Sequence, residues 1–169
     1  MNYEEWARSV PREITGAPLW RVEAYRLALF AAEVEWRGVA KLIGDQRTRS
    51  LSDQLCRALG STSANIAEGY SRGTGKDRAR FYEYALGSAR ESRDWYYKAR
   101  HVLGDTVVQH RLDLLTQIIR LLLTMVPQQR GHTMREEAVS YHVTATYSQS
   151  SATADCGLLE NLLQDIPLP

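Results

Sequence analysis

Apolar side chains recur at steps of three and four residues along most of the chain between residues 19 and 127, and this spacing constrains the fold most strongly. Steps of this kind place side chains on one face of a helix, and no period-two alternation typical of strands interrupts them. The rows that keep this spacing run through residues 22–43, 51–65, 81–102 and 108–126. The sequence therefore predicts an all-α fold.

The connections between these four segments are short. They read "GDQRT", "SRGTGKD" and the dipeptide Gly104-Asp105, in which glycine ends one helix and aspartate caps the next. Short connections make consecutive helices antiparallel neighbours. We expect an antiparallel up-down-up-down four-helix bundle over residues 19–131, in which Pro127 ends the fourth helix.

The two ends of the chain lack this regular spacing. Two prolines and a glycine in residues 1–18 predict a flexible, loosely packed N-terminal arm. Residues 132–169 predict a mostly irregular acidic tail, in which 140–155 are irregular or form a weak strand. Leucines at 157–166 predict a short amphipathic helix. This helix either docks in a partner's groove or folds back onto its own bundle.

Composition fits one ordinary globular domain. The 169 residues are 24% charged and 44% apolar, and no apolar run reaches the length of a membrane span. The first residues carry acids where a signal peptide needs an apolar stretch, so we expect a cytoplasmic protein that does not enter a membrane. Cys56 and Cys156 lie too far apart in sequence to suggest a disulfide framework or a zinc motif.

Charge is distributed unevenly, although the net charge is only +1. Residues 1–46 carry a net −1, residues 47–131 a net +6 and residues 132–169 a net −4. A basic middle followed by an acidic tail indicates a polyanionic partner, or a tail that competes with such a partner for the same surface. The alternative is a solvated helical surface that binds nothing.

The turn "SRGTGKD" raises the question of a phosphate-binding loop, because glycines adjoin a lysine. The phosphate-loop motif requires a glycine where Tyr70 stands, a hydroxyl side chain where Asp77 stands, and a preceding strand. All three requirements fail. The turn instead predicts a corner between two helices. Gly69 would end the helix before the turn with a left-handed backbone. Thr74 would cap the helix after the turn, and the Asp77 side chain would bond back to Thr74.

A basic and aromatic face on the third helix is the candidate nucleic-acid surface. Basic residues contact phosphates and tyrosines stack on bases, and an exposed helix start favours anions. The alternative is a surface with local ion pairs, such as Arg90 with Asp94. The candidate residues are Arg72, Lys76, Arg78, Tyr82, Arg93, Tyr96 and Arg100.

Two further sets of residues have predicted structural roles. Asn65 falls on the apolar row of the second helix, where a polar group needs a partner. The first set is a polar network that fixes helix register: Arg57, Asn65, Glu68 and Glu91. The fourth helix carries a second apolar row that one bundle core would leave exposed, so we expect self-association, unless a terminal extension covers the row. That predicted oligomer interface comprises Val107, Leu114, Ile118, Leu121 and Met125.

Signals for catalysis or metal binding are weak. Di-metal sites in bundles use a carboxylate three residues before a histidine, and none of the four histidines has one. The nucleophile motif G-x-S-x-G does not occur. We therefore expect no enzyme activity, no metal and no cofactor.

Two stretches of sequence resemble a known family. The run Ala64-Asn65-Ile66-Ala67-Glu68-Gly69 is preceded by Gln54-Leu55 and Arg57-Ala58, and followed by Phe81, Gly87-Ser88 and Glu91. Together they resemble the bacterial four-helix-bundle family that includes two groups. One group is encoded in intervening sequences of large-subunit ribosomal RNA genes. The other is the accessory variability determinant of diversity-generating retroelements.

The resemblance covers residues 19–127 and implies a non-enzymatic bundle that assembles as a barrel-like homopentamer. Its retroelement members imply binding to a reverse transcriptase and to RNA or DNA through basic surfaces. The first hypothesis is thus an oligomeric nucleic-acid-binding accessory protein. The alternative is a protein-interaction scaffold, of the ribosomal RNA intervening-sequence type, that displays its C-terminal tails to a protein partner.

Overall fold

The computed structural model describes residues 2–131, 153–164 and 166–169. In this part of the chain the structure is helical and contains no strand, which confirms the all-α prediction. The helices are α1 (Tyr3–Ser9), α2 (Arg12–Thr15), the 3-10 turn η1 (Pro18–Arg21), α3 (Glu23–Gly44), α4 (Arg49–Tyr70), α5 (Gly75–Leu103), α6 (Asp105–Arg130) and α7 (Thr153–Gln164).

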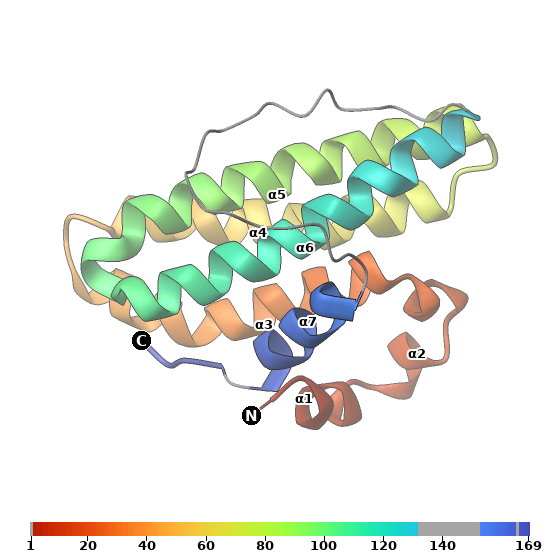
Figure 1. The fold of residues 1–169 in the computed structure, drawn as a ribbon. Helices are drawn as coiled ribbons and strands as arrows, with labels where there is room; N and C mark the ends of the chain where they lie inside the picture. Colours follow the sequence, from red (N-terminus) through yellow and green to blue (C-terminus); the bar gives the residue numbers. More distant parts are fainter. Residues whose placement is uncertain (1, 132–152, 165) are drawn as a thin grey trace.

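The four long helices, α3 to α6, form an antiparallel bundle (Figure 1). Each packs on its neighbour in sequence, and α3 also packs on α6, which closes the ring. The core contains mainly leucine, isoleucine, alanine and valine from all four helices. Between α5 and α6 a single residue, Gly104, makes the reversal with a φ of 89°, a backbone conformation that glycine adopts without strain. None of the helices in the described ranges is long and apolar enough to cross a membrane.

The face that α3 turns to the core is not the apolar row expected from its spacing. Ala24, Leu27, Ala31, Val34 and Leu42 are buried in the core, together with Ala28 and Phe30. The row expected to face the core comprises Val22, Tyr25, Leu29, Ala32, Trp36, Val39 and Ile43. Of these, Trp36 and Ile43 are 78% and 45% exposed. The helix is apolar on two sides, so periodicity alone could not decide which side faces inward.

The fourth helix also differs from expectation. α6 continues through Pro127 to Arg130 and ends at Gly131, which has a left-handed φ of 70° and donates its N–H to the Pro127 carbonyl. Proline within a helix removes one donor, but the surrounding packing keeps this helix intact.

The predicted exposed row on α6 is wrong for three of its five residues. Val107, Leu114 and Ile118 are 5%, 0% and 0% exposed, and Leu121 and Met125 are partly buried against the core. The reason is that α6 packs on α5, α3 and α7, so that it has neighbours on more than one side. A single chain therefore covers most of this row. Assembly into a homopentamer stays a prediction.

The N-terminal arm packs on the bundle instead of lying loose. Asn2 caps α1, and its side chain accepts a bond from the Glu5 N–H at 2.9 Å. Trp6 is buried, with its ring centroid 5.9 Å from that of Trp20 and 5.1 Å from that of Phe30. Aromatic side chains bury large areas, and this cluster holds the arm in spite of its prolines.

The C-terminal segment folds back onto its own bundle, which was one of the two alternatives. α7 lies against α6 and α1 (Figure 1). Leu162 is buried, and Leu159, Leu163 and Ile166 pack against the core. The helix in this segment runs from Thr153 to Gln164, against the predicted bounds of 157–166. Most of the stretch 140–155, predicted to be irregular or a weak strand, lies outside the described residues.

Candidate functional site

The turn between α4 and α5 is a packing corner. Thr74 caps α5 as predicted: its hydroxyl accepts from the Asp77 N–H at 3.1 Å. The same hydroxyl donates to the Asp77 carboxylate at 2.7 Å. A β-carbon at Gly75 would lie 2.3 Å from the Gln129 carbonyl oxygen. Glycine at this position therefore lets the start of α5 approach the end of α6.

Gly69 has a different role from the one expected. Its φ is not in the left-handed region, since only Gly104 and Gly131 have positive φ values in the described chain. A β-carbon at Gly69 would lie 2.7 Å from the ring of Tyr82. The lack of a side chain thus makes room for that tyrosine between α4 and α5.

Two of the predicted phosphate ligands have structural partners at this corner. Arg78 donates to the Gln129 side chain at 2.9 Å and to the Arg72 carbonyl at 3.0 Å, so that it ties α5 to α6 and to the turn. Arg72 pairs with Glu68 and lies over the Phe81 ring, 4.5 Å from its centroid. Lys76 is exposed.

The two tyrosines predicted to stack on bases are buried, so this part of the prediction is wrong. Tyr82 is 3% exposed and Tyr96 is 1% exposed. The buried side of α5 is rotated toward these tyrosines and away from Phe81 and Trp95, which are only partly buried. Small residues such as Ala85 and Ser92 gave too weak an apolar signal to set the rotation of the helix.

Two other tyrosines on α5 are exposed instead, and each adjoins arginines. Tyr84 is 46% exposed and accepts from Arg80 Nε at 2.7 Å. Tyr97 is 55% exposed, and the Arg100 guanidinium lies 4.1 Å from its ring centroid. Arginine over an aromatic ring is a favourable cation–π arrangement. The resulting surface keeps the basic and aromatic chemistry of the prediction but uses different aromatic residues.

Each exposed tyrosine lines a surface pocket. The corner pocket, of about 360 Å³, is lined by Arg72, Asp77, Arg80, Phe81 and Tyr84. The α5–α6 groove, of about 440 Å³, is lined by Arg90, Arg93, Asp94, Tyr97, Gln109, Leu112, Asp113 and Thr116. The acids in both pockets have local partners: Thr74 binds Asp77, Lys98 binds Asp94 and Gln109 binds Asp113. Of these partners only Lys98 is charged, so it offsets the charge of Asp94, whereas Asp77 and Asp113 keep their negative charges beside the arginines.

The predicted polar network around Asn65 does not form as one network. Asn65 donates to the backbone and side chain of Ser61, Glu68 pairs with Arg72, and Glu91 accepts from the Trp95 indole at 3.1 Å. These contacts are local, within one helix or at its end. Arg57 is exposed and bonds to none of the other three.

A buried polar network does exist, but it lies elsewhere in the bundle. Glu35 on α3 is 2% exposed and accepts from the Tyr96 hydroxyl on α5 at 2.6 Å. Burial raises the pKa of Glu35 to about 7, against the opposing effects of the Tyr96 hydrogen bond and the Arg111 charge. Arg111 on α6 is also 2% exposed. The bundle therefore encloses a carboxylate and a guanidinium.

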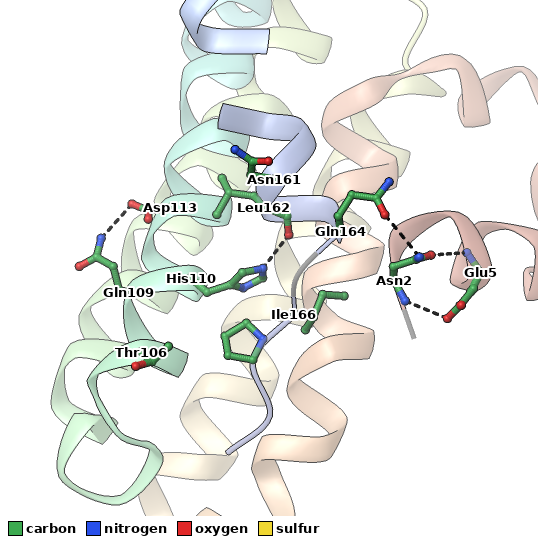
Figure 2. Close-up of a pocket in the computed structure, with 11 residues that line it drawn as sticks. Asn2, Glu5, Thr106, Gln109, His110, Asp113, Asn161, Leu162, Gln164 and Ile166 are labelled. Atoms are coloured by element: carbon green, nitrogen blue, oxygen red, sulfur yellow. Dashed lines mark hydrogen bonds between the residues drawn. The ribbon is translucent and has the colours of Figure 1, made fainter. Parts of the chain in front are cut away.

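The same network reaches the C-terminal segment. Arg111 Nη1 and His110 Nδ1 are 2.6 Å apart, and since a guanidinium can only donate, Nδ1 accepts. Nε2 then carries the proton and donates to the Leu162 carbonyl at 2.7 Å (Figure 2). Arg111 Nη2 donates to the Pro167 carbonyl at 3.1 Å. Neutral His110 and charged Arg111 thus hold the backbone of the C-terminal segment on α6.

An open groove of about 770 Å³ adjoins His110 between α6, the N-terminus and the C-terminal segment (Figure 2). Its polar side chains mostly bind each other: Asn2 donates to Gln164 at 3.5 Å and Gln109 to Asp113 at 2.9 Å. Among the described residues, no cluster of three or more histidine, cysteine or carboxylate side chains could hold a metal ion.

Sequence reasoning missed Glu35 and Arg111, although a signal was present. The row Val108, Arg111, Leu115 and Ile118 keeps the helical spacing, and only Arg111 in it is charged. Glu35 occupies the equivalent place between Ala31 and Leu42 on α3. A charged residue of each sign on a buried helix face indicates a buried pair.

Comparisons with known proteins agree with the bundle. The model of the 23S rRNA-intervening sequence protein family matches residues 21–124. A crystal structure from Bacteroides thetaiotaomicron, of a protein with unknown function from the S23 ribosomal protein family, has a TM-score of 0.57. The two chains are 21% identical in sequence, and the match covers 61% of this chain and 97% of the other. At this identity the likeness shows the fold alone. Comparison with curated proteins gives no match.

Proposed function

Because the chain belongs to the 23S rRNA-intervening sequence protein family, we propose that it is a non-catalytic accessory protein that binds nucleic acid through α5. The observation that carries this proposal is the pair of arginine–tyrosine pockets on that helix, the corner pocket and the α5–α6 groove. Neither the family description nor that of the similar structure names a catalytic activity.

The chemistry of the two pockets suits a single-stranded or looped nucleic acid. Guanidinium groups bind phosphate oxygens, and an exposed tyrosine offers a ring face to an unstacked base. Helix α5 carries seven basic and four acidic residues, so its surface attracts a polyanion. In this proposal Arg80 and Arg93 bind phosphates, and Tyr84 and Tyr97 stack on bases.

The protein partner in this proposal is the reverse transcriptase implied by the retroelement side of the resemblance. The competing hypothesis, a scaffold that displays its C-terminal tails, requires a free tail. Hydrogen bonds from His110 and Arg111 to the C-terminal backbone weigh against a freely displayed segment. We therefore favour nucleic-acid binding as the function to test first.

The test is fluorescence anisotropy with a labelled RNA stem–loop and a labelled single-stranded DNA over a range of salt concentrations. We expect Arg80→Ala/Arg93→Ala to weaken binding and to reduce the salt slope by about 0.7–0.9 for each lost phosphate contact. Tyr97→Ala should weaken binding by about 1–3 kcal/mol if one base stacks there.

The matched control is Arg8→Ala/Arg47→Ala, which removes the same charge from exposed arginines outside α5. It should change affinity only slightly. If the control pair and the α5 pair weaken binding equally, the contact surface is not α5. If neither nucleic acid binds the wild-type protein at low salt, nucleic-acid binding is excluded and the scaffold hypothesis becomes the stronger one.

A further inference from the structure

A small apolar pocket lies between α3 and α4, separate from the pockets on α5. Its volume is about 160 Å³, and its walls include Ala32, Val39 and Leu59. Trp36, which is 78% exposed, also lines it. An engineered apolar cavity of about 150 Å³ holds one benzene molecule, so this pocket has room for a group of that size.

The polar residue that lines this pocket is the buried carboxylate Glu35, together with the Cys56 thiol. Glu35 Oε2 accepts the Tyr96 hydrogen bond, but Oε1 has no hydrogen-bond partner in the described structure. The charged and titratable groups that face Glu35 are Tyr96 on α5, Arg111 on α6 and Cys56 on α4. Arg111 Nε, in the same buried network, also has no partner in the described structure. A buried carboxylate oxygen without a donor is costly, and a donor entering from the pocket would remove that cost at Oε1.

We propose that this pocket binds a small apolar primary amine, whose ammonium group donates to Glu35 Oε1 and whose hydrocarbon part fills the space between α3 and α4. The charge of the ligand follows from the carboxylate, and its size follows from the volume of the pocket. The indole of Trp36 adds an aromatic face beside the cation.

The proposal is tested with benzylamine as the probe, on the full-length protein carrying Cys156→Ser. Binding is measured by titration calorimetry and by the rate at which Cys56, exposed at the pocket, reacts with a thiol reagent. The measurement is made at about pH 8, where Glu35 is ionised. We expect saturable binding and slower reaction of Cys56. Benzyl alcohol, which has the same shape without the charge, should bind at least about tenfold more weakly.

Two variants and one control make the result specific. Glu35→Gln keeps the shape of the side chain and an acceptor for Tyr96, and it should reduce affinity by about tenfold to a hundredfold. Gly60→Leu should abolish binding, because it adds a side chain at the pocket where a β-carbon meets nothing within 4 Å. The control Glu33→Gln removes an exposed carboxylate from the same helix and should change nothing.

Three outcomes would overturn the proposal: equal binding of benzylamine and benzyl alcohol, unchanged affinity in Glu35→Gln, or no protection of Cys56 at saturating benzylamine. The first two would show an apolar cavity without charge recognition. The third would place the ligand at another site. None of these results depends on nucleic-acid binding by α5.

Discussion

Two glycines in this protein differ in what surrounds the place where a side chain would stand. Gly69 lies against the buried ring of Tyr82, whereas Gly87 lies exposed in the middle of α5 with nothing within 4 Å of its β-position. The same substitution should therefore have opposite signs. We expect Gly69→Ala to destabilise the protein by about 1–3 kcal/mol through overpacking. Gly87→Ala should stabilise it by about 0.5–1 kcal/mol, because alanine favours the helix.

Urea unfolding of both variants and the wild type would measure these two changes. Gly87→Ala serves as the control for the general effect of adding a methyl group to a helix. Equal stabilisation by both substitutions would show that the Tyr82 ring moves aside at no cost, contrary to the tight contact between α4 and α5.

Residue roles that depend on local sequence could be predicted, and those that depend on distant neighbours could not. The Thr74 cap follows from residues three positions apart, so its prediction is confirmed. The carboxylate of Glu35 meets the Tyr96 hydroxyl across 61 positions of sequence. The sequence around Glu35 indicates only that a charged residue falls on one of the two apolar sides of α3, and it does not identify Tyr96 as the partner.

At the scale of elements, α7 is held on α6 through His110, whose contact with Arg111 depends on pH. A protonated His110 would still donate from Nε2 to Leu162, but its Nδ1 could no longer accept from Arg111, and two positive charges would adjoin. His110 must be neutral to accept from Arg111 while it donates to the Leu162 carbonyl. Burial, together with the nearby charge of Arg111, lowers the pKa of His110, against the opposing effect of the bond to Leu162. A lowered histidine pKa means that the unfolded state binds protons more readily. The stabilisation is therefore complete above the ordinary pKa, about 6.5, and is lost as pH falls below it.

We expect acidification from about pH 7.5 to pH 5 to loosen the C-terminal segment, seen as faster amide hydrogen exchange in residues 157–169. The experiment uses the Glu35→Gln background, because the raised pKa of Glu35 gives an opposite pH dependence in an overlapping range. Rates are corrected for the intrinsic effect of pH on exchange. His110→Gln should abolish the response, and the control His101→Gln, at an exposed position on α5, should leave it intact. If acid still speeds exchange in His110→Gln, the pH response of the C-terminal segment belongs to another titratable group.

The four long helices could be predicted from periodicity, but the short helices of the N-terminal arm and the rotation of the long helices about their own axes could not. α3 is apolar on two sides and α5 has small residues on its buried side, so that the spacing fits more than one rotation. α6 contacts several helices at once, which explains why a second apolar row is buried in one chain. The rotation of each helix about its axis is decided by the packing of all the helices together, and the sequence of a single helix does not contain that information.

For the molecule as a whole, the two ends of the chain complete the bundle. α1 lies against α7, and α7 lies on α6, so residues from both termini cover one side of the four long helices (Figure 1). Large apolar side chains of the C-terminal segment, Leu159, Leu162, Leu163 and Ile166, pack against the core. Each fully buried side chain of this size contributes about 1.5–3 kcal/mol, and partly buried ones contribute less. The bundle therefore depends on its C-terminal segment for part of its stability.

A chain that ends at Gly131 should consequently be less stable, and it should self-associate more strongly than the full-length protein. The cause is that removal of α7 exposes apolar surface on α6 that the full chain covers. Thermal unfolding and light scattering at matched concentrations measure the two effects. Deletion of Leu168 and Pro169 alone is the control, because Leu168 is 62% exposed and the Pro167 carbonyl that binds Arg111 remains. If the long truncation matches full-length protein in melting temperature and in mass, α7 does not protect this face.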